Sequence, residues 1–210
     1  MSQTMRGQVE AYFATLGELG ARTLATNQKG ESVTLDAAMT WGLDTLQRVR
    51  RDRRRVFFIG NGGSAGIASH MATDWMKTGG FSALAFNDGA MLTCLSNDLG
   101  YDNVFAVPLA HHAGNNDLLI AISSSGRSAN ILAGVRAARS VGAQIITLSG
   151  FGADNPLRTQ GEMNFYVPNS RYGFVEIAHL TICHSLLDLA MGWRANGDEP
   201  RYVTQAGMAP

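Results

Sequence analysis

Short apolar runs alternate with helix-length segments along most of this chain, and this alternation constrains the fold more than any other feature. Five runs rich in β-branched or aromatic residues lie at 56–60, 82–86, 118–123, 144–149 and 163–168. Crossover helices are expected over 64–78, over 88–111 with a break at Gly-Tyr-Asp, over 127–142, and a last helix at about 173–194. Such βαβ repetition predicts an α/β fold with a five-stranded parallel sheet flanked by helices.

The region before the first strand carries a helical pattern. Apolar residues recur at spacings of three and four over 5–27 and 35–52, which predicts two amphipathic helices. The polar linker NQKGES between them indicates a helix stop and restart. We expect a single domain, because 210 residues are too few for two of full size. Its parts are a helical oligomerisation segment (1–54), an α/β core (55–195) and a tail (196–210).

Composition excludes several classes of partner. Seventeen basic and seventeen acidic residues leave no net charge, so no basic field exists to hold nucleic acid or an anionic membrane. With 45% hydrophobic and only 16% charged residues, part of the surface is expected to be covered by other subunits. No signal peptide or membrane-spanning stretch is evident, so we expect a soluble cytoplasmic protein. Cys94 and Cys183 lie in apolar segments and are expected to be buried thiols.

An arginine-rich run, RVRRDRRR, ends the second predicted helix at residues 48–55. Cations at a helix C-terminus complement the helix dipole, and no aromatic residue interleaves this run. We therefore expect a solvated face here, and not a nucleic-acid site.

Two loops that follow predicted strands carry the chemistry. In a parallel sheet of this kind, ligands bind beyond the carboxyl ends of the strands. The glycine loop, Gly60–Ala65, lets backbone amides approach a ligand closely, and its Ser64 can cap the next helix or bind the ligand. The serine loop, Ser123–Ser128, offers four hydroxyls at a helix N-terminus without the lysine of a nucleotide P-loop. Helix capping explains one or two of these serines, so the cluster predicts a site for a small phosphorylated ligand.

Polar side chains on two predicted helices suggest a second element of a site. His70 and Asp74 are four residues apart and share a helix face, so they could bind a metal or a substrate together. Glu176, His179 and His184 lie among apolar residues of the last helix. Glu176 and His179 share a face, whereas Glu176 and His184 are separated by a rise of ~12 Å, awkward for one ion. Spacing alone leaves both pairings open.

The segments FIGNGGSAGIASH and AISSSGRSANIL together resemble the sugar isomerase (SIS) domain family, and within it the D-sedoheptulose 7-phosphate isomerases. The likeness extends over about residues 35–192, including SNDLGYDNVF and EIAHLTICHSLLDL. The resemblance implies a flavodoxin-like SIS fold and a homotetramer built by the N-terminal helices. It also implies active sites at subunit interfaces, with one Zn²⁺ in each.

The resemblance also implies roles for individual residues. Asp74 and His184 would be the catalytic acid–base pair, and the metal ligands would be His70, Asp74, Glu176 and His184. The substrate would contact Asn61, Gly62, Gly63, Ser64, Asp98, Ser123, Ser124, Ser125, Ser128 and Glu176. The chain departs from the family pattern at Asp74, usually Glu, and at Glu176, usually Gln. It departs again at Arg127, often a small polar residue, which could reach a phosphate or point to solvent.

The expected activity is an aldose–ketose isomerisation, which converts sedoheptulose 7-phosphate to D-glycero-D-manno-heptose 7-phosphate through an enediol. In such a family the product feeds heptose-nucleotide synthesis for lipopolysaccharide, capsule or another surface glycan. One alternative is a non-catalytic SIS module that binds a protein such as the bacterial replication initiator. Modules of that kind lack the acidic residue matching Asp74 and the histidine matching His184. A second alternative is an isomerase of another phosphosugar, because nothing in the two loops measures chain length.

Overall fold

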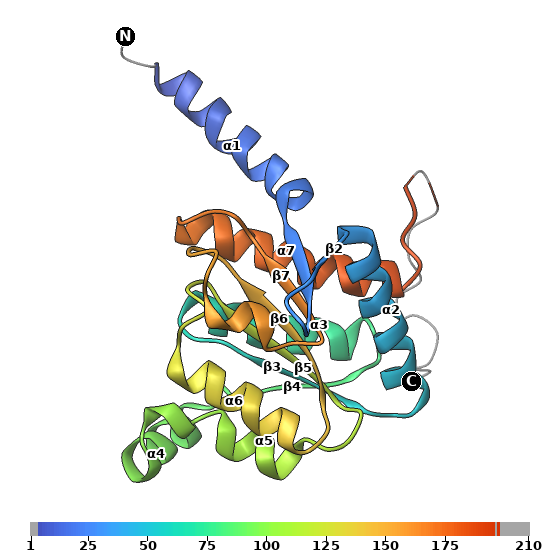
Figure 1. Cartoon of the computed structure of the whole chain (residues 1–210), viewed down its shortest axis with the longest axis vertical. Coiled ribbons are helices and arrows are strands. Elements are labelled where there is room, and N and C mark those ends of the chain that lie inside the picture. Colours follow the sequence, from blue (N-terminus) through green and yellow to red (C-terminus); the bar gives the residue numbers. More distant parts are fainter. Residues whose placement is uncertain (1–3, 196, 198–210) are drawn as a thin grey trace, which may run out of the picture.

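The computed structural model describes residues 4–195 and 197, and it places one seven-stranded sheet between two layers of helices (Figure 1). The strands are β1 Leu24–Asn27, β2 Ser32–Val33, β3 Arg55–Ile59, β4 Ser82–Ala85, β5 Leu118–Ser123, β6 Gln144–Ser149 and β7 Met163–Tyr166. The α-helices are α1 Met5–Arg22, α2 Leu35–Arg51, α3 Gly63–Lys77, α4 Gly89–Leu99, α5 Ala106–His112, α6 Ala129–Ser140 and α7 Tyr172–Ala190. Two short 3₁₀ turns are η1 Tyr101–Asn103 and η2 Pro156–Thr159.

The five predicted parallel strands are confirmed as β3 to β7, in the spatial order β4-β3-β5-β6-β7. The chain reverses its direction of winding between β3 and β5, so the loops after these two neighbouring strands lie side by side. Alternate residues of β3 face opposite layers. Val56 and Phe58 belong to the cluster under α2, α3 and α7, whereas Phe57 and Ile59 face α5 and α6.

The helical prediction for the N-terminal segment is wrong at residues 24–27, which form strand β1. β1 pairs antiparallel with β2 and with β7, and this hairpin extends the sheet from five strands to seven. The physical reason is tertiary: the edge of β7 needs partners for its backbone groups, and Asn164 of β7 donates to the Thr26 carbonyl. Gly30, with φ +76°, supplies the turn of the hairpin. Of the predicted tail, only Gly197 lies within the described residues.

Two helices differ in how they are covered. The N-terminal part of α1 projects away from the rest of the molecule (Figure 1), and its apolar side chains Val9 and Phe13 are exposed, whereas Leu19 near its C-terminal end is buried in the core. α7 has a mean hydropathy of 1.2 and is long and apolar enough to cross a membrane by length and composition alone. In this fold, however, it is a core helix that packs on α1, α2 and α3.

Cys183 of α7 is buried as expected, and burial raises the pKa of its thiol to about 12. Cys94 is exposed on α4, contrary to expectation.

Candidate active site

A cavity of about 250 Å³ lies where the glycine loop and the serine loop meet. Residues of both loops and of α7 line it, namely Asn61, Gly62, Gly63, Ser64, Ser123, Ser124, Ser125, Ser128, Tyr172 and Glu176. The structure thus brings together nine of the ten residues expected to contact substrate. The exception is Asp98, which is exposed on α4, where it accepts hydrogen bonds from Asn97 (2.8 Å) and from the Cys94 thiol (3.6 Å).

The glycine loop brings backbone close to the cavity. Gly62 has φ +53° and occupies the N-cap position of α3 without a side-chain capping bond. Ser64 therefore does not cap the helix, and its buried hydroxyl lines the cavity instead. A Cβ atom at Gly63 would collide with the carboxylate of Glu176. The absence of a side chain at Gly63 therefore lets the Glu176 carboxylate rest directly on the backbone at the start of α3.

The serine loop folds tightly at the N-terminus of α6. Ser123 Oγ accepts a hydrogen bond from the Gly126 amide (3.1 Å) and lies 3.4 Å from Ser128 Oγ. Ser125 Oγ accepts from the Arg127 amide (3.3 Å). The buried Ser124 Oγ has no hydrogen-bond partner in the described part of the chain. Clustered hydroxyls at a helix N-terminus suit a phosphate group, which accepts hydrogen bonds and is favoured by the helix dipole.

Asn61 ties the two loops together. Its amide exchanges two hydrogen bonds of 2.9 Å with the amide of Asn130 on α6, and Tyr101 donates a further one of 3.0 Å to Asn61 Oδ1. Sequence reasoning missed Asn130, Tyr101 and the cavity residue Tyr172. Asn130 offered a signal, because it is a polar residue within an otherwise small and apolar helix start, ANIL.

Arg127 does not line the cavity. Its guanidinium forms an ion pair of 2.8 Å with Asp154, and this hydrogen-bonded contact lowers the pKa of the Asp154 carboxyl. Of the two open alternatives for Arg127, the structure therefore shows a surface position with a carboxylate partner.

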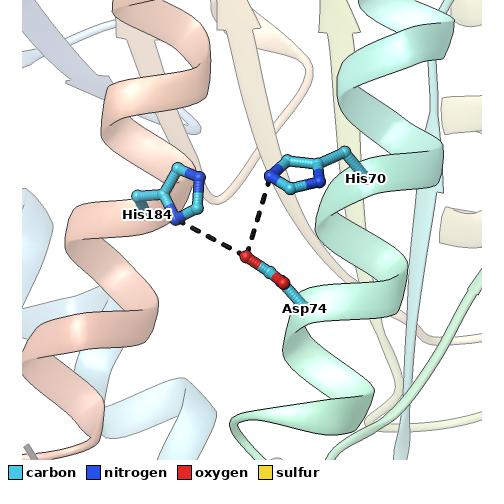
Figure 2. A group of neighbouring side chains, drawn as sticks. All are labelled: His70, Asp74 and His184. Atoms are coloured by element: carbon cyan, nitrogen blue, oxygen red, sulfur yellow. Dashed lines mark ion pairs between the residues drawn. The ribbon is translucent and has the colours of Figure 1, made fainter.

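A second group of polar side chains lies between α3 and α7 (Figure 2). Asp74 Oδ2 is 3.7 Å from His70 Nε2 and 4.0 Å from His184 Nδ1. One ligand atom from each residue can be chosen so that all three lie within 4.8 Å of one another. Two imidazole nitrogens and one carboxylate oxygen form a donor set that catalytic zinc sites use, with a further position left for water or substrate. The three residues therefore fit a divalent metal.

Glu176 and His179, the other two residues considered as metal ligands, do not belong to this group of three. Glu176 is outside the group of three and lines the hydroxyl-rich cavity instead. His179 is fully buried, and its Nε2 lies 3.1 Å from the Ser149 carbonyl. Burial lowers the pKa of His179 to about 4. A histidine packed and hydrogen-bonded in this way is a core residue, so the pairing of Glu176 with His179 gains no support from the structure.

This chain is similar to a family model and to several known proteins. Residues 19–150 match the family model of the SIS domain. A phosphoheptose isomerase of Solidesulfovibrio magneticus is 38% identical over 142 residues, which cover 64% of this chain and 68% of that protein. One from Helicobacter pylori is 32% identical over 152 residues, covering 70% and 77%. The structure of a phosphoheptose isomerase from Neisseria gonorrhoeae superposes with a TM-score of 0.73 at 27% identity, covering 89% and 98%.

Proposed function

The chain belongs to the SIS-domain family, as a relative of its phosphoheptose isomerases, and we propose that it interconverts sedoheptulose 7-phosphate and D-glycero-D-manno-heptose 7-phosphate. The observation that carries the proposal is the position of α3. Its first turn lines the cavity of hydroxyls, and its later turns present His70 and Asp74. One helix thus joins a phosphate site to a pair of groups suited to acid–base chemistry.

The serine loop holds the phosphate of the substrate. Five serine hydroxyls line the cavity, and the amides at the starts of α3 and α6 add further donors. From Gly63 to His70, α3 rises by about 10 Å. This rise is comparable to the reach of an extended seven-carbon chain from its phosphate to its carbonyl end.

Asp74 and His184 move the protons. In the ketose-to-aldose direction, one of them takes the proton from C1, and the electrons of that C–H bond form the C1=C2 double bond of the enediol. The electrons of the C2 carbonyl move onto O2, which takes a proton from the other residue. A proton then returns to C2, while O1 loses its proton and becomes the aldehyde oxygen. The other residue of the pair exchanges the oxygen protons, so no external oxidant or reductant is needed.

We propose that the site holds one Zn²⁺, with one ligand atom each from His70, Asp74 and His184. The second carboxylate oxygen of Asp74 and the second ring nitrogen of His184 then remain for proton exchange. Such an ion, when bound, polarises a carbonyl and stabilises negative charge on the neighbouring oxygens. Protein purified without chelator should contain about one zinc per chain, and His70→Ala should lower that content. Elemental analysis measures this without any activity assay. Full zinc content in both His70→Ala and His184→Ala would contradict the assignment.

We propose a homotetramer with active sites at subunit interfaces, as the family resemblance implies, and the exposed side chains of α1 support this proposal. We further propose that Glu176, which rests on Gly63 at the start of α3, contacts the substrate. We also propose that Asp98 reaches the sugar only in the assembled protein. A cytoplasmic enzyme that supplies heptose phosphate for surface-glycan synthesis agrees with these features.

The decisive experiment incubates the purified protein with ketose phosphates of five, six and seven carbons and follows aldose formation. We expect the highest kcat/KM with sedoheptulose 7-phosphate. A clear preference for a shorter substrate would assign the protein to another phosphosugar. Absence of turnover with every substrate, at full zinc content, would favour a non-catalytic binding module.

A further inference from the structure

The isomerase site does not use the arginine run at the end of α2. The structure places part of this run in a second cavity, of about 320 Å³, formed by the end of α2, the turn between α2 and β3, and the segment that joins α3 to the start of β4. The residues of this arginine pocket are Val49, Arg50, Arg53, Arg54, Gly80, Phe81 and Ser82. It opens at the amino ends of the parallel strands, whereas the serine cavity lies beyond their carboxyl ends.

Within the described residues, no carboxylate lines the arginine pocket or forms an ion pair with its arginines. Asp52, the one acidic residue of the run, is held by Arg51 through contacts of 2.8 and 3.0 Å. Arg55 donates to the His112 carbonyl (2.6 Å). The three arginines that line the pocket form no ion pair within the described residues, and no acidic side chain lines the cavity.

The backbone at Arg53 is in a conformation that disfavours a side chain. Arg53 has φ +50°, in the left-handed region. Its amide donates to the Arg50 carbonyl (3.3 Å), and the Arg54 amide donates to the Val49 carbonyl (2.8 Å). These bonds form a Schellman turn, and the residue that ordinarily occupies the left-handed position of this turn is glycine.

Two other helices of the same chain end in the same turn, and both use glycine. At the end of α6, Gly142 has φ +82° and donates to the Arg139 carbonyl. At the end of α7, Gly192 has φ +99° and donates to the Leu189 carbonyl. The helix dipole does not explain why α2 carries arginine there, because its effect falls off within the last turn, and Arg53 and Arg54 lie beyond that turn. Asn116 and Phe151 also have positive φ, so the backbone alone does not single out Arg53. What distinguishes Arg53 is that this exposed arginine lines the same pocket as Arg50 and Arg54, where three like charges lie together.

We propose that the arginine pocket binds the diphosphate group of a small phosphorylated molecule. A guanidinium contacts phosphate oxygens through two parallel N–H donors, and three such groups match the charge of a diphosphate. The volume lies at the lower end of the range for small-molecule sites, so a diphosphate with a small attached group fits. A single-stranded nucleic acid fits less well, because Phe81, the aromatic residue of the pocket, is buried and offers no stacking surface.

Calorimetric titration of the intact protein with inorganic pyrophosphate and with ADP, at physiological salt, tests this proposal. The serine cavity also binds phosphate, so the titration uses the variant in which Ser123 and Ser125 are both replaced by alanine, and in it we expect one site per chain. Arg54→Gln and Arg53→Gly should each weaken binding at least about 10-fold. The control is Arg136→Gln, which removes an exposed arginine of α6, and it should leave the affinity unchanged.

Arg53→Gly separates binding from a structural role. Glycine relieves the left-handed backbone, so the Tm should rise while the affinity for pyrophosphate falls. A drop in both would indicate that Arg53 serves the fold. The proposal is overturned if the double serine variant binds neither probe, if Arg136→Gln weakens binding equally, or if a short oligonucleotide binds through these arginines and the diphosphates do not.

Discussion

Asp74 is the residue on which the isomerase proposal depends most, because its carboxylate lies between two imidazoles. Asp74→Asn preserves size and shape but removes the negative charge and the basic lone pairs. We expect kcat to fall by ~10²-fold or more, with little change in Tm. The measurement is aldose formation from sedoheptulose 7-phosphate, together with the zinc content of each variant.

Asp74→Glu is the matched control, because it retains the charge and adds one methylene. It should keep measurable activity where the asparagine variant does not. If Asp74→Asn turns over the substrate at the parent rate, Asp74 does not take part in the proton transfer.

His179 makes stability depend on pH. Burial lowers its pKa from 6.5 to about 4, so the folded protein holds the ring neutral while the unfolded chain takes up a proton below pH 6.5. Its contribution to the free energy of unfolding is therefore complete above pH 6.5 and is lost as the pH falls toward 4. The loss amounts to about 2 kcal/mol between pH 7.5 and pH 5.

Urea unfolding of the parent and of His179→Gln at those two pH values measures this loss. Glutamine can still donate to the Ser149 carbonyl but does not titrate, so its stability should change less with pH. His111→Gln, at an exposed position on α5, should keep the pH dependence of the parent. Equal slopes for all three proteins would show that His179 does not cause the acid sensitivity.

The sequence was sufficient to predict those cavity residues that lie in the loop directly after a strand. Gly62 and Ser125 line the cavity because parallel strands deliver their following loops to the same edge. Tyr172 could not be found in this way, since its place depends on how α7 packs against both loops. Asp98 was expected from the resemblance alone, and in a single chain α4 holds it away from the cavity.

At the scale of elements, substitutions in the serine loop should weaken substrate binding more than they slow catalysis. Ser123→Ala and Ser125→Ala together remove two hydroxyls that line the cavity. Hydrogen bonds to a charged group contribute about 1.5–3 kcal/mol each, so KM should rise at least about 10-fold while kcat changes less. Steady-state kinetics with sedoheptulose 7-phosphate provide both values.

Ser140→Ala, at the exposed C-terminal end of α6, is the control for this pair and should leave KM unchanged. If KM is unchanged in the double variant and circular dichroism shows an intact fold, the serine loop does not bind the phosphate.

Buried parallel strands were predictable as elements because both of their faces are covered, which makes each one a continuous apolar run. β5 and β6 have the predicted bounds. The hairpin of β1 and β2 was not predictable in the same way. Its four-residue strand, Leu-Ala-Thr-Asn, follows a helix without a marked break in periodicity, and its identity comes from pairing with β7, which lies more than 130 residues later in the chain.

At the scale of the whole molecule, α1 is incompletely covered in a single chain. Met5, Val9, Tyr12 and Phe13 are 74%, 48%, 45% and 66% exposed. Behind this helix, a cavity of about 490 Å³ lies against α2 and α7, with an apolar lining that includes Leu16, Met39 and Ile182. Apolar surface of this kind on a projecting helix is typical of an interface between subunits.

We therefore expect light scattering at micromolar concentration to give a mass of four times 22.5 kDa, or about 90 kDa. Val9→Glu combined with Phe13→Glu places two charges on the apolar face of α1 and should shift the protein toward smaller species, because an interface core rejects unpaired charge. Ala11→Glu combined with Ala14→Glu adds the same charges at exposed positions away from that face and should leave the mass unchanged. If the active site is completed by a neighbouring subunit, the Val9 and Phe13 variant should also lose isomerase activity while retaining its far-UV circular dichroism. A mass of 22.5 kDa for the parent protein would contradict both the tetramer and any active site shared between subunits.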